Sequence, residues 1–137
     1  MHQLDSKTPV QVKTLAGPLL EWAVAWTLRL PQVLWKEEKD GPVVYAAIGK
    51  ESEQVQLRLS TNPEQLKQVC VANGISWTVV YESTGTNNEI YHANARHKGA
   101  QGYGKSSAGR ALAICRAIVE AHHVTIILPT ALVEAAR

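Results

Sequence analysis

The chain has 137 residues and a hydrophobic content of 45%, which suits one globular domain with a packed core and excludes a largely disordered chain. Its net charge of +2 is too small to indicate nucleic-acid binding by itself. Its longest apolar stretch, Leu19–Leu30, is shorter than the ~20 residues of a membrane span, and the N-terminal segment lacks the apolar region of a signal peptide. We therefore expect one cytoplasmic domain over residues 1–137, with a loose segment at 1–11.

Proline residues delimit the first predicted helix, over residues 16–30. Pro18 can occupy the first helical turn, and Pro31 ends the helix. The apolar residues of this segment surround the helix nearly completely, which predicts burial on more than one side. A polar turn containing the sequence Asp-Gly-Pro is predicted at 36–42.

Two strands and a short helix are predicted in the middle of the chain. The first strand covers 42–49 and the second covers 53–60. In the second, the apolar residues Val55, Leu57 and Leu59 are predicted to share one face. Residues 62–74 begin with an asparagine cap and a proline, which predicts a helix, although the valines of this segment also suit a strand.

The C-terminal half begins with a predicted antiparallel hairpin, whose strands cover 76–83 and 89–95 around the polar turn TGTNN. A glycine-rich loop follows, and then an amphipathic helix over 106–123, a buried strand over 124–129 and a closing helix over 130–137. This order predicts an α+β fold in which a small, largely antiparallel sheet packs against two main helices.

The cysteine and histidine residues do not form a catalytic or metal-binding pattern. Cys70 and Cys115 each lie in an apolar run, so we expect both thiols to be reduced and buried. His92 and His97 are five residues apart, and His122 and His123 end a predicted helix, where imidazolium groups interact favourably with the helix dipole. We therefore predict no catalytic residue, no metal site and no cofactor.

Residues Gly99–Ser106 match the phosphate-binding loop pattern G-x-x-x-x-G-K-[ST], with a predicted helix after them. A nucleotide-hydrolysing loop of this type follows a buried strand, and a second strand supplies an acid for magnesium. Here the preceding residues are polar, and the only acids that follow are Glu120 and Glu134. Because the remaining chain is also too short for parallel crossovers, we do not expect an NTPase.

The same segment supports a second prediction, that the start of the long helix binds a phosphate or carboxylate without hydrolysis. Five basic residues and no acid lie between Glu89 and Glu120. Such a positive field attracts anions, including nucleotides and nucleic acid; the alternatives are an ordinary solvated face and a serine that caps the helix. The candidate anion ligands are Lys105, Ser106, Ser107, Arg96, Lys98 and Arg110.

Two aromatic residues are candidates for contact with a partner, because aromatic side chains anchor many interfaces. They are Tyr103, in the glycine-rich segment, and Trp35; ordinary packing is the alternative for both. Charged residues make up only 19% of the chain, against roughly 25% in soluble domains, which favours self-association or a partner protein.

Three segments together resemble a family of uncharacterised proteins from tailed phages and prophages that includes the lambdoid NinX proteins. They are LAGPLLEWAVA, STNPEQLKQVCVANGIS and GKSSAGRALAICRAIVEAHHVTIILPTAL. The chain departs from the family pattern at Ser106-Ser107, where the family has Thr-Pro, and at His122-His123, where it has Gly followed by an acid. The segment Val43–Leu59 has no counterpart.

This resemblance implies an origin in a phage or another mobile element and implies no particular activity. We therefore expect a non-enzymatic accessory protein that binds a host macromolecule, with inhibition of a host defence system such as a CRISPR effector as the sharpest form of this hypothesis. The alternative is a small-ligand protein that binds a phosphate-bearing molecule or nucleotide at the basic segment Gly99–Ser107.

Overall fold

A computed structural model describes residues 6–49, 53–83, 85 and 89–137. These residues form four α-helices, one short 3₁₀ helix and eight strands, and every strand pairing is antiparallel. The strands form three small sheets, ordered β1-β8, β2-β3-β4 and β5-β6-β7. The predicted α+β class is confirmed. No helix in the described ranges is long and apolar enough to cross a membrane.

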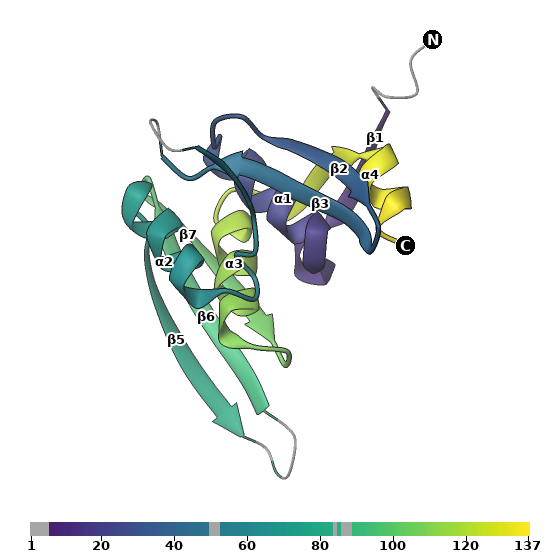
Figure 1. Ribbon diagram of the computed structural model, residues 1–137. Helices are drawn as coiled ribbons and strands as arrows, with labels where there is room; N and C mark the ends of the chain where they lie inside the picture. The colour runs from purple at the N-terminus through teal and green to yellow at the C-terminus, as the bar shows by residue number, and fades with distance from the viewer. Residues whose placement is uncertain (1–5, 50–52, 84, 86–88) are drawn as a thin grey trace.

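Two runs of three consecutive strands, β2 to β4 and β5 to β7, are separated and flanked by helices and single strands. The first six are β1 (Lys7–Gln11), the 3₁₀ helix η2 (Val12–Thr14), α1 (Gly17–Leu28), β2 (Leu34–Glu38), β3 (Gly41–Ala47) and β4 (Gln54–Gln56). The remaining seven are α2 (Pro63–Ala72), β5 (Ser76–Ser83), β6 (Glu89–His97), β7 (Ala100–Ser106), α3 (Arg110–Glu120), β8 (Thr125–Pro129) and α4 (Thr130–Ala135). Figure 1 shows α3 in the middle, with the β5–β6–β7 sheet along one side of it.

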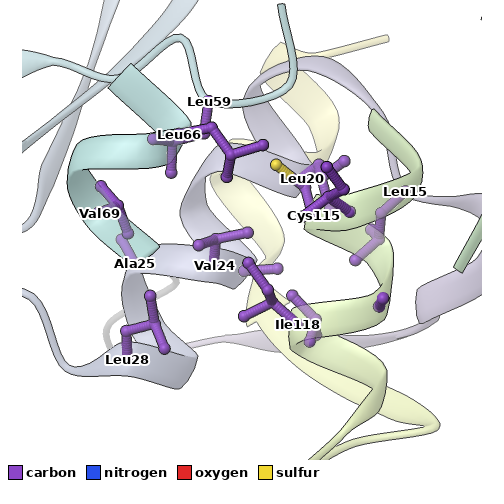
Figure 2. Close-up of a cluster of buried hydrophobic side chains, with 14 of the residues drawn as sticks. Leu15, Leu20, Val24, Ala25, Leu28, Leu59, Leu66, Val69, Cys115 and Ile118 are labelled. Carbon is purple, nitrogen blue, oxygen red and sulfur yellow. The ribbon is translucent and has the colours of Figure 1, made fainter. Parts of the chain in front are cut away.

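Helix α1 begins and ends where the prolines predict. Pro18 lies in its first turn, and Arg29 ends it in the left-handed conformation, with a φ of 55°. Buried residues from several sides of α1 join side chains of α2 and α3 in the core (Figure 2). The labelled members of this core are Leu15, Leu20, Val24, Ala25, Leu28, Leu59, Leu66, Val69, Cys115 and Ile118.

Both cysteines are buried free thiols, as predicted. Burial raises the pKa of the Cys70 thiol to about 11 and that of the Cys115 thiol well above its ordinary value. Because a protonated thiol is a poor nucleophile, neither cysteine is suited to covalent chemistry in the folded protein.

A buried carboxylate connects α1 to the segment before α2. The two oxygens of Glu21 accept hydrogen bonds from the Leu59 amide at 2.6 Å, the Ser60 amide at 3.0 Å and the Ser60 hydroxyl at 2.6 Å. Burial raises the pKa of Glu21, although these three donors favour its charged form. Glu21 therefore holds the chain in a turn at a point where the sequence predicts a continuing strand.

The second predicted strand, over 53–60, is much shorter than expected. Only Gln54–Gln56 is a strand, and the chain turns from Arg58, whose carbonyl accepts the amide hydrogen of Asn62 at 2.7 Å. The expected common face of apolar residues is also wrong, because Val55 is exposed whereas Leu57 is buried.

Two predicted irregular segments are strands instead. Residues 36–38, assigned to a turn, belong to the exposed end of β2, which pairs with β3. Lys7–Gln11, assigned to the loose N-terminal segment, forms β1, with Pro9 opposite Ile127 of β8. Residues 1–5 of that segment lie outside the described residues. Ile127 is 57% exposed, so the strand predicted to be buried covers the core on one face only.

The predicted glycine-rich loop is strand β7, which pairs with β6. A Cβ atom at Gly104 would lie 2.1 Å from the carbonyl oxygen of Ala113, and one at Gly102 would lie 2.2 Å from that of Ala117. These glycines are therefore required because the α3 backbone packs directly on the strand. They do not surround a phosphate, as they would in a nucleotide-hydrolysing loop.

Helix α3 and the hairpin before it follow the prediction with shifted boundaries. The helix begins at Arg110, four residues later than predicted, because Gly109 has a φ of 152°, which favours glycine. Strands β5 and β6 form the predicted antiparallel hairpin. Helix α2 is also confirmed, since the Asn62 side chain accepts a hydrogen bond from the Gln65 amide.

A candidate anion-binding cavity at the edge of β7

A cavity of about 700 Å³ lies where η2, the free edge of β7 and α3 meet. Its volume is within the usual range for small-ligand sites. It is lined by Gln11, Val12, Lys13, Ile90, Tyr103, Gly104, Lys105, Ser106, Ser107, Arg116, Glu120 and Val124. Ile90 and Tyr103 belong to the face of the sheet opposite α3, so the cavity continues onto that face.

Two side chains of α3 cover the free edge of β7. Arg116 donates hydrogen bonds to the carbonyl oxygen of Leu15 at 2.8 Å and to that of Lys105 at 2.7 Å. Glu120 accepts the amide hydrogen of Tyr103. Partial burial lowers the pKa of Arg116, but a guanidinium group remains charged at neutral pH. Together these bonds fix the inner wall of the cavity and protect the strand edge from pairing with another chain.

The cavity carries a net positive charge. Three cations line it, Lys13 from η2, Lys105 from β7 and Arg116 from α3, against one acid, Glu120. Among the described residues, neither lysine ammonium group has a hydrogen-bond partner in the protein, nor does the hydroxyl of Ser107. These groups are therefore available to an anion that enters the cavity.

A chain of three polar side chains lies on the face of the sheet next to the cavity. The ring nitrogen Nδ1 of His92 is hydrogen-bonded to the hydroxyl of Tyr103, and its Nε2 lies 3.0 Å from a carboxylate oxygen of Glu82. The rings of His92 and Tyr103 are stacked, with centroids 5.9 Å apart and an interplanar angle of 29°. Cross-strand bonds thus hold both rings in one orientation.

The residues predicted to bind an anion do not form one cluster. Lys105, Ser106 and Ser107 line the cavity, but the Ser106 hydroxyl accepts the amide hydrogen of Ala108. Helix α3 has Gly109 as its N-cap and no side-chain cap hydrogen bond, so the alternative of a serine that caps the helix is wrong. The other three lie at the far end of the sheet or on its opposite side. They are Arg96, near Gln101; Lys98, in the turn between β6 and β7; and Arg110, whose guanidinium lies 5.7 Å from the Trp77 ring centroid.

The two aromatic candidates also differ in their surroundings. Tyr103 is 44% exposed beside the cavity. Trp35 is partly buried on β2 and packs against the hydrophobic core, which agrees with the packing alternative. Only Tyr103 of this pair lies at the candidate site.

Sequence reasoning missed Lys13, Arg116 and Glu120 as members of the site. Lys13 is about a hundred residues from Arg116 in the chain, and the pairing of β1 with β8 brings η2 to the cavity. One signal was present: Arg116 and Glu120 are four residues apart on the predicted helix and so share one face.

A pair of histidines, His97 and His122, lies outside the cavity, at the other end of β6 from His92. The Nδ1 atom of the buried His97 is 2.8 Å from the Nε2 atom of His122, which follows α3. Burial, together with the charges of His122 and Lys98, lowers the pKa of His97. His122 thus lies at the end of α3, as the sequence predicts, and its side chain also contacts that of His97.

We expect this pair to make stability depend on pH. Because the pKa of His97 is lower in the folded protein than its ordinary value of 6.5, the unfolded chain binds the proton more tightly. The contribution of His97 to the free energy of unfolding should therefore be constant above about pH 6.5 and should decrease as the pH falls from 6.5 to the lowered pKa. Thermal unfolding between pH 7.5 and 5, compared with His97→Asn, measures this effect; an equal decrease in the variant contradicts it.

No group of three or more histidine, cysteine, aspartate or glutamate side chains is placed to hold a metal ion within the described ranges. Comparison with protein-family models gave no match to the chain, and comparison with curated proteins gave none either.

Proposed function

We propose that the protein is a non-catalytic binding protein that captures a phosphate group of its ligand in the cavity at the edge of β7. The observation that carries this proposal is the convergence of Lys13, Lys105 and Arg116 from three different elements on one cavity. Because the fold holds these cations together, binding an anion between them reduces their mutual repulsion as well as forming charge-assisted hydrogen bonds.

The apolar part of the lining narrows the class of ligand. Val12, Ile90 and Val124 line the cavity beside the cations, and Tyr103 lies at its margin. A ligand with a phosphate and an attached apolar or aromatic group fits this combination better than a free inorganic ion does. The residues that we propose as ligands of a phosphate or nucleotide are therefore Lys105 and Ser107, which the sequence predicts, together with Lys13 and Arg116.

The phage-family resemblance adds a proposal about context. A phage or mobile-element accessory protein with this site would recognise a phosphate-bearing host macromolecule. Counter-defence is the most specific version of that role. Recovery of a host defence component that binds the original protein, but does not bind a variant without Lys13 and Lys105, would support it.

Calorimetric titration with pyrophosphate and with a nucleoside 5′-monophosphate tests the phosphate site. We expect both to bind, the nucleotide more tightly, and the double variant Lys13→Gln/Lys105→Gln to lose at least about tenfold in affinity, since it removes two charge-assisted hydrogen bonds. Both lysines are exposed, so the variant should fold normally.

The control variant is Lys39→Gln/Lys67→Gln, which removes the same charge from exposed positions that do not line the cavity. It should retain the affinity of the original protein. Absence of binding by either ligand, or an equal loss in both double variants, contradicts the proposed site.

A further inference from the structure

We infer that the phosphate held in the cavity belongs to a single strand of nucleic acid, and that the bases next to it lie on the outer face of the β5–β6–β7 sheet. This inference rests on the proposed phosphate site and names its ligand class. The outer face is defined as the side of this sheet opposite α3.

The outer face is open and mainly polar. Helix α3 packs on the other side, where Gly102 and Gly104 contact it, and the outward-pointing side chains of β5 and β7 are exposed. The side chains that point outward, by the strand register, are Ser76, Thr78, Val80, Glu82, Ile90, His92, Asn94, Arg96, Gln101, Tyr103 and Lys105. This set includes an aromatic ring, an imidazole, a guanidinium and two amides, which are the groups that stack on and hydrogen-bond to unpaired bases.

The cross-strand pair of Tyr103 and His92 forms a platform for stacking. The hydrogen bond between the two rings and the contact of His92 with Glu82 fix the rings before any ligand binds. A fixed platform loses little conformational entropy on binding. Tyr103 also lines the cavity, so a nucleotide whose phosphate contacts Lys105 places its base near this platform.

Cations lie at both ends of the outer face. Lys105 is opposite His92 in the register, and Arg96 is four residues further along β6, a separation of about 13 Å at 3.3 Å per residue. Lys98 follows in the adjoining turn. Cations spaced across the sheet can contact several phosphates of one nucleic-acid strand, because a nucleic acid carries a phosphate at every nucleotide.

The exposed Tyr103 ring on this face favours a single strand over a duplex. Stacking on Tyr103 requires a base that is free of its neighbours, and a duplex presents only its sugar–phosphate surface and groove edges. The site size of single-strand-binding modules is on the order of 4–16 nucleotides.

Fluorescence anisotropy with labelled oligonucleotides of about ten nucleotides tests the inference, using oligo(dT), oligo(U) and a DNA duplex of the same length. We expect at least one single-stranded probe to bind more tightly than the duplex, with an affinity that falls as salt increases. Comparison of the two single-stranded probes shows whether DNA or RNA is preferred. The variant Tyr103→Ala should weaken binding roughly 5- to 100-fold.

A matched control is available on the same sheet. Tyr81 is 52% exposed, but it pairs with Tyr91 on the side of the sheet that faces α3. The variant Tyr81→Ala should therefore leave the oligonucleotide affinity unchanged. Equal losses in the Tyr103 and Tyr81 variants contradict the stacking platform.

The two proposals fail in different ways. If pyrophosphate binds through Lys13 and Lys105 but oligonucleotides bind no more tightly than a nucleoside monophosphate, the nucleic-acid inference is overturned and the phosphate site stands. If oligonucleotides bind through Tyr103 while the Lys13→Gln/Lys105→Gln variant is unaffected, the cavity is not the phosphate site. If neither ligand binds, both proposals are overturned.

Discussion

Replacement of Glu21 by alanine should destabilise the protein by about 3 kcal/mol. The substitution leaves two buried amide groups, of Leu59 and Ser60, and the Ser60 hydroxyl without their acceptor. It also removes the bond between α1 and the turn that precedes α2, so these elements lose their fixed spacing. Urea unfolding followed by tryptophan fluorescence measures the change.

Two further variants separate the causes. Glu21→Gln keeps the side-chain volume but replaces one of the two acceptor oxygens with an NH₂ group, which cannot accept the hydrogen of the amide it faces, so it should still lose about 2 kcal/mol. Glu64→Ala, at an exposed position in α2, should change stability by no more than about 0.5 kcal/mol. A loss in Glu21→Ala as small as that in Glu64→Ala contradicts the assigned role of the buried carboxylate.

Replacement of Gly104 by alanine should destabilise the protein by about 3 kcal/mol or more. The new Cβ atom would lie 2.1 Å from the Ala113 carbonyl oxygen and 2.5 Å from the Ala117 nitrogen. Both atoms are helix backbone, which cannot rotate away, so α3 must shift and the core it packs against must repack. Thermal and urea unfolding both report this loss.

The comparison variant is Gly99→Ala, in the turn before β7. Gly99 has open space around its Cβ position but a φ of 81°, so only backbone strain, about 1–2 kcal/mol, is expected there. The difference between the two variants isolates the contact between strand and helix. If Gly104→Ala is no more destabilising than Gly99→Ala, the result contradicts the claim that the α3 backbone packs directly on β7.

Local signals determined which elements could be predicted. The prolines around α1 and the cap of α2 act within a few residues, and both helices were predicted correctly. Strand β2 was missed because its exposed end consists of polar residues and resembles a turn. Strand β7 was missed because its glycines are explained by contact with α3, which no local pattern reveals.

The candidate site was predictable only where its residues are consecutive in sequence. Lys105 was identified from the phosphate-loop pattern, although it lies in a strand, and Ser107 was identified from the predicted start of the long helix. Lys13 reaches the same cavity through the pairing of β1 with β8, and Arg96 is carried to the far end of the sheet by the register of β6. Tertiary pairing therefore decided which cations act together.

The position of a bound phosphate tests the central claim most directly. Amide chemical shifts recorded by NMR during titration of the original protein with a nucleoside 5′-monophosphate should move most at Lys13, Lys105, Ser107 and Arg116, with Tyr103 affected by the base. The amide chemical shifts of residues in β2 and β3 should not change. Shifts confined to other parts of the molecule, or no shifts at all, would show that the cavity at the edge of β7 does not bind phosphate.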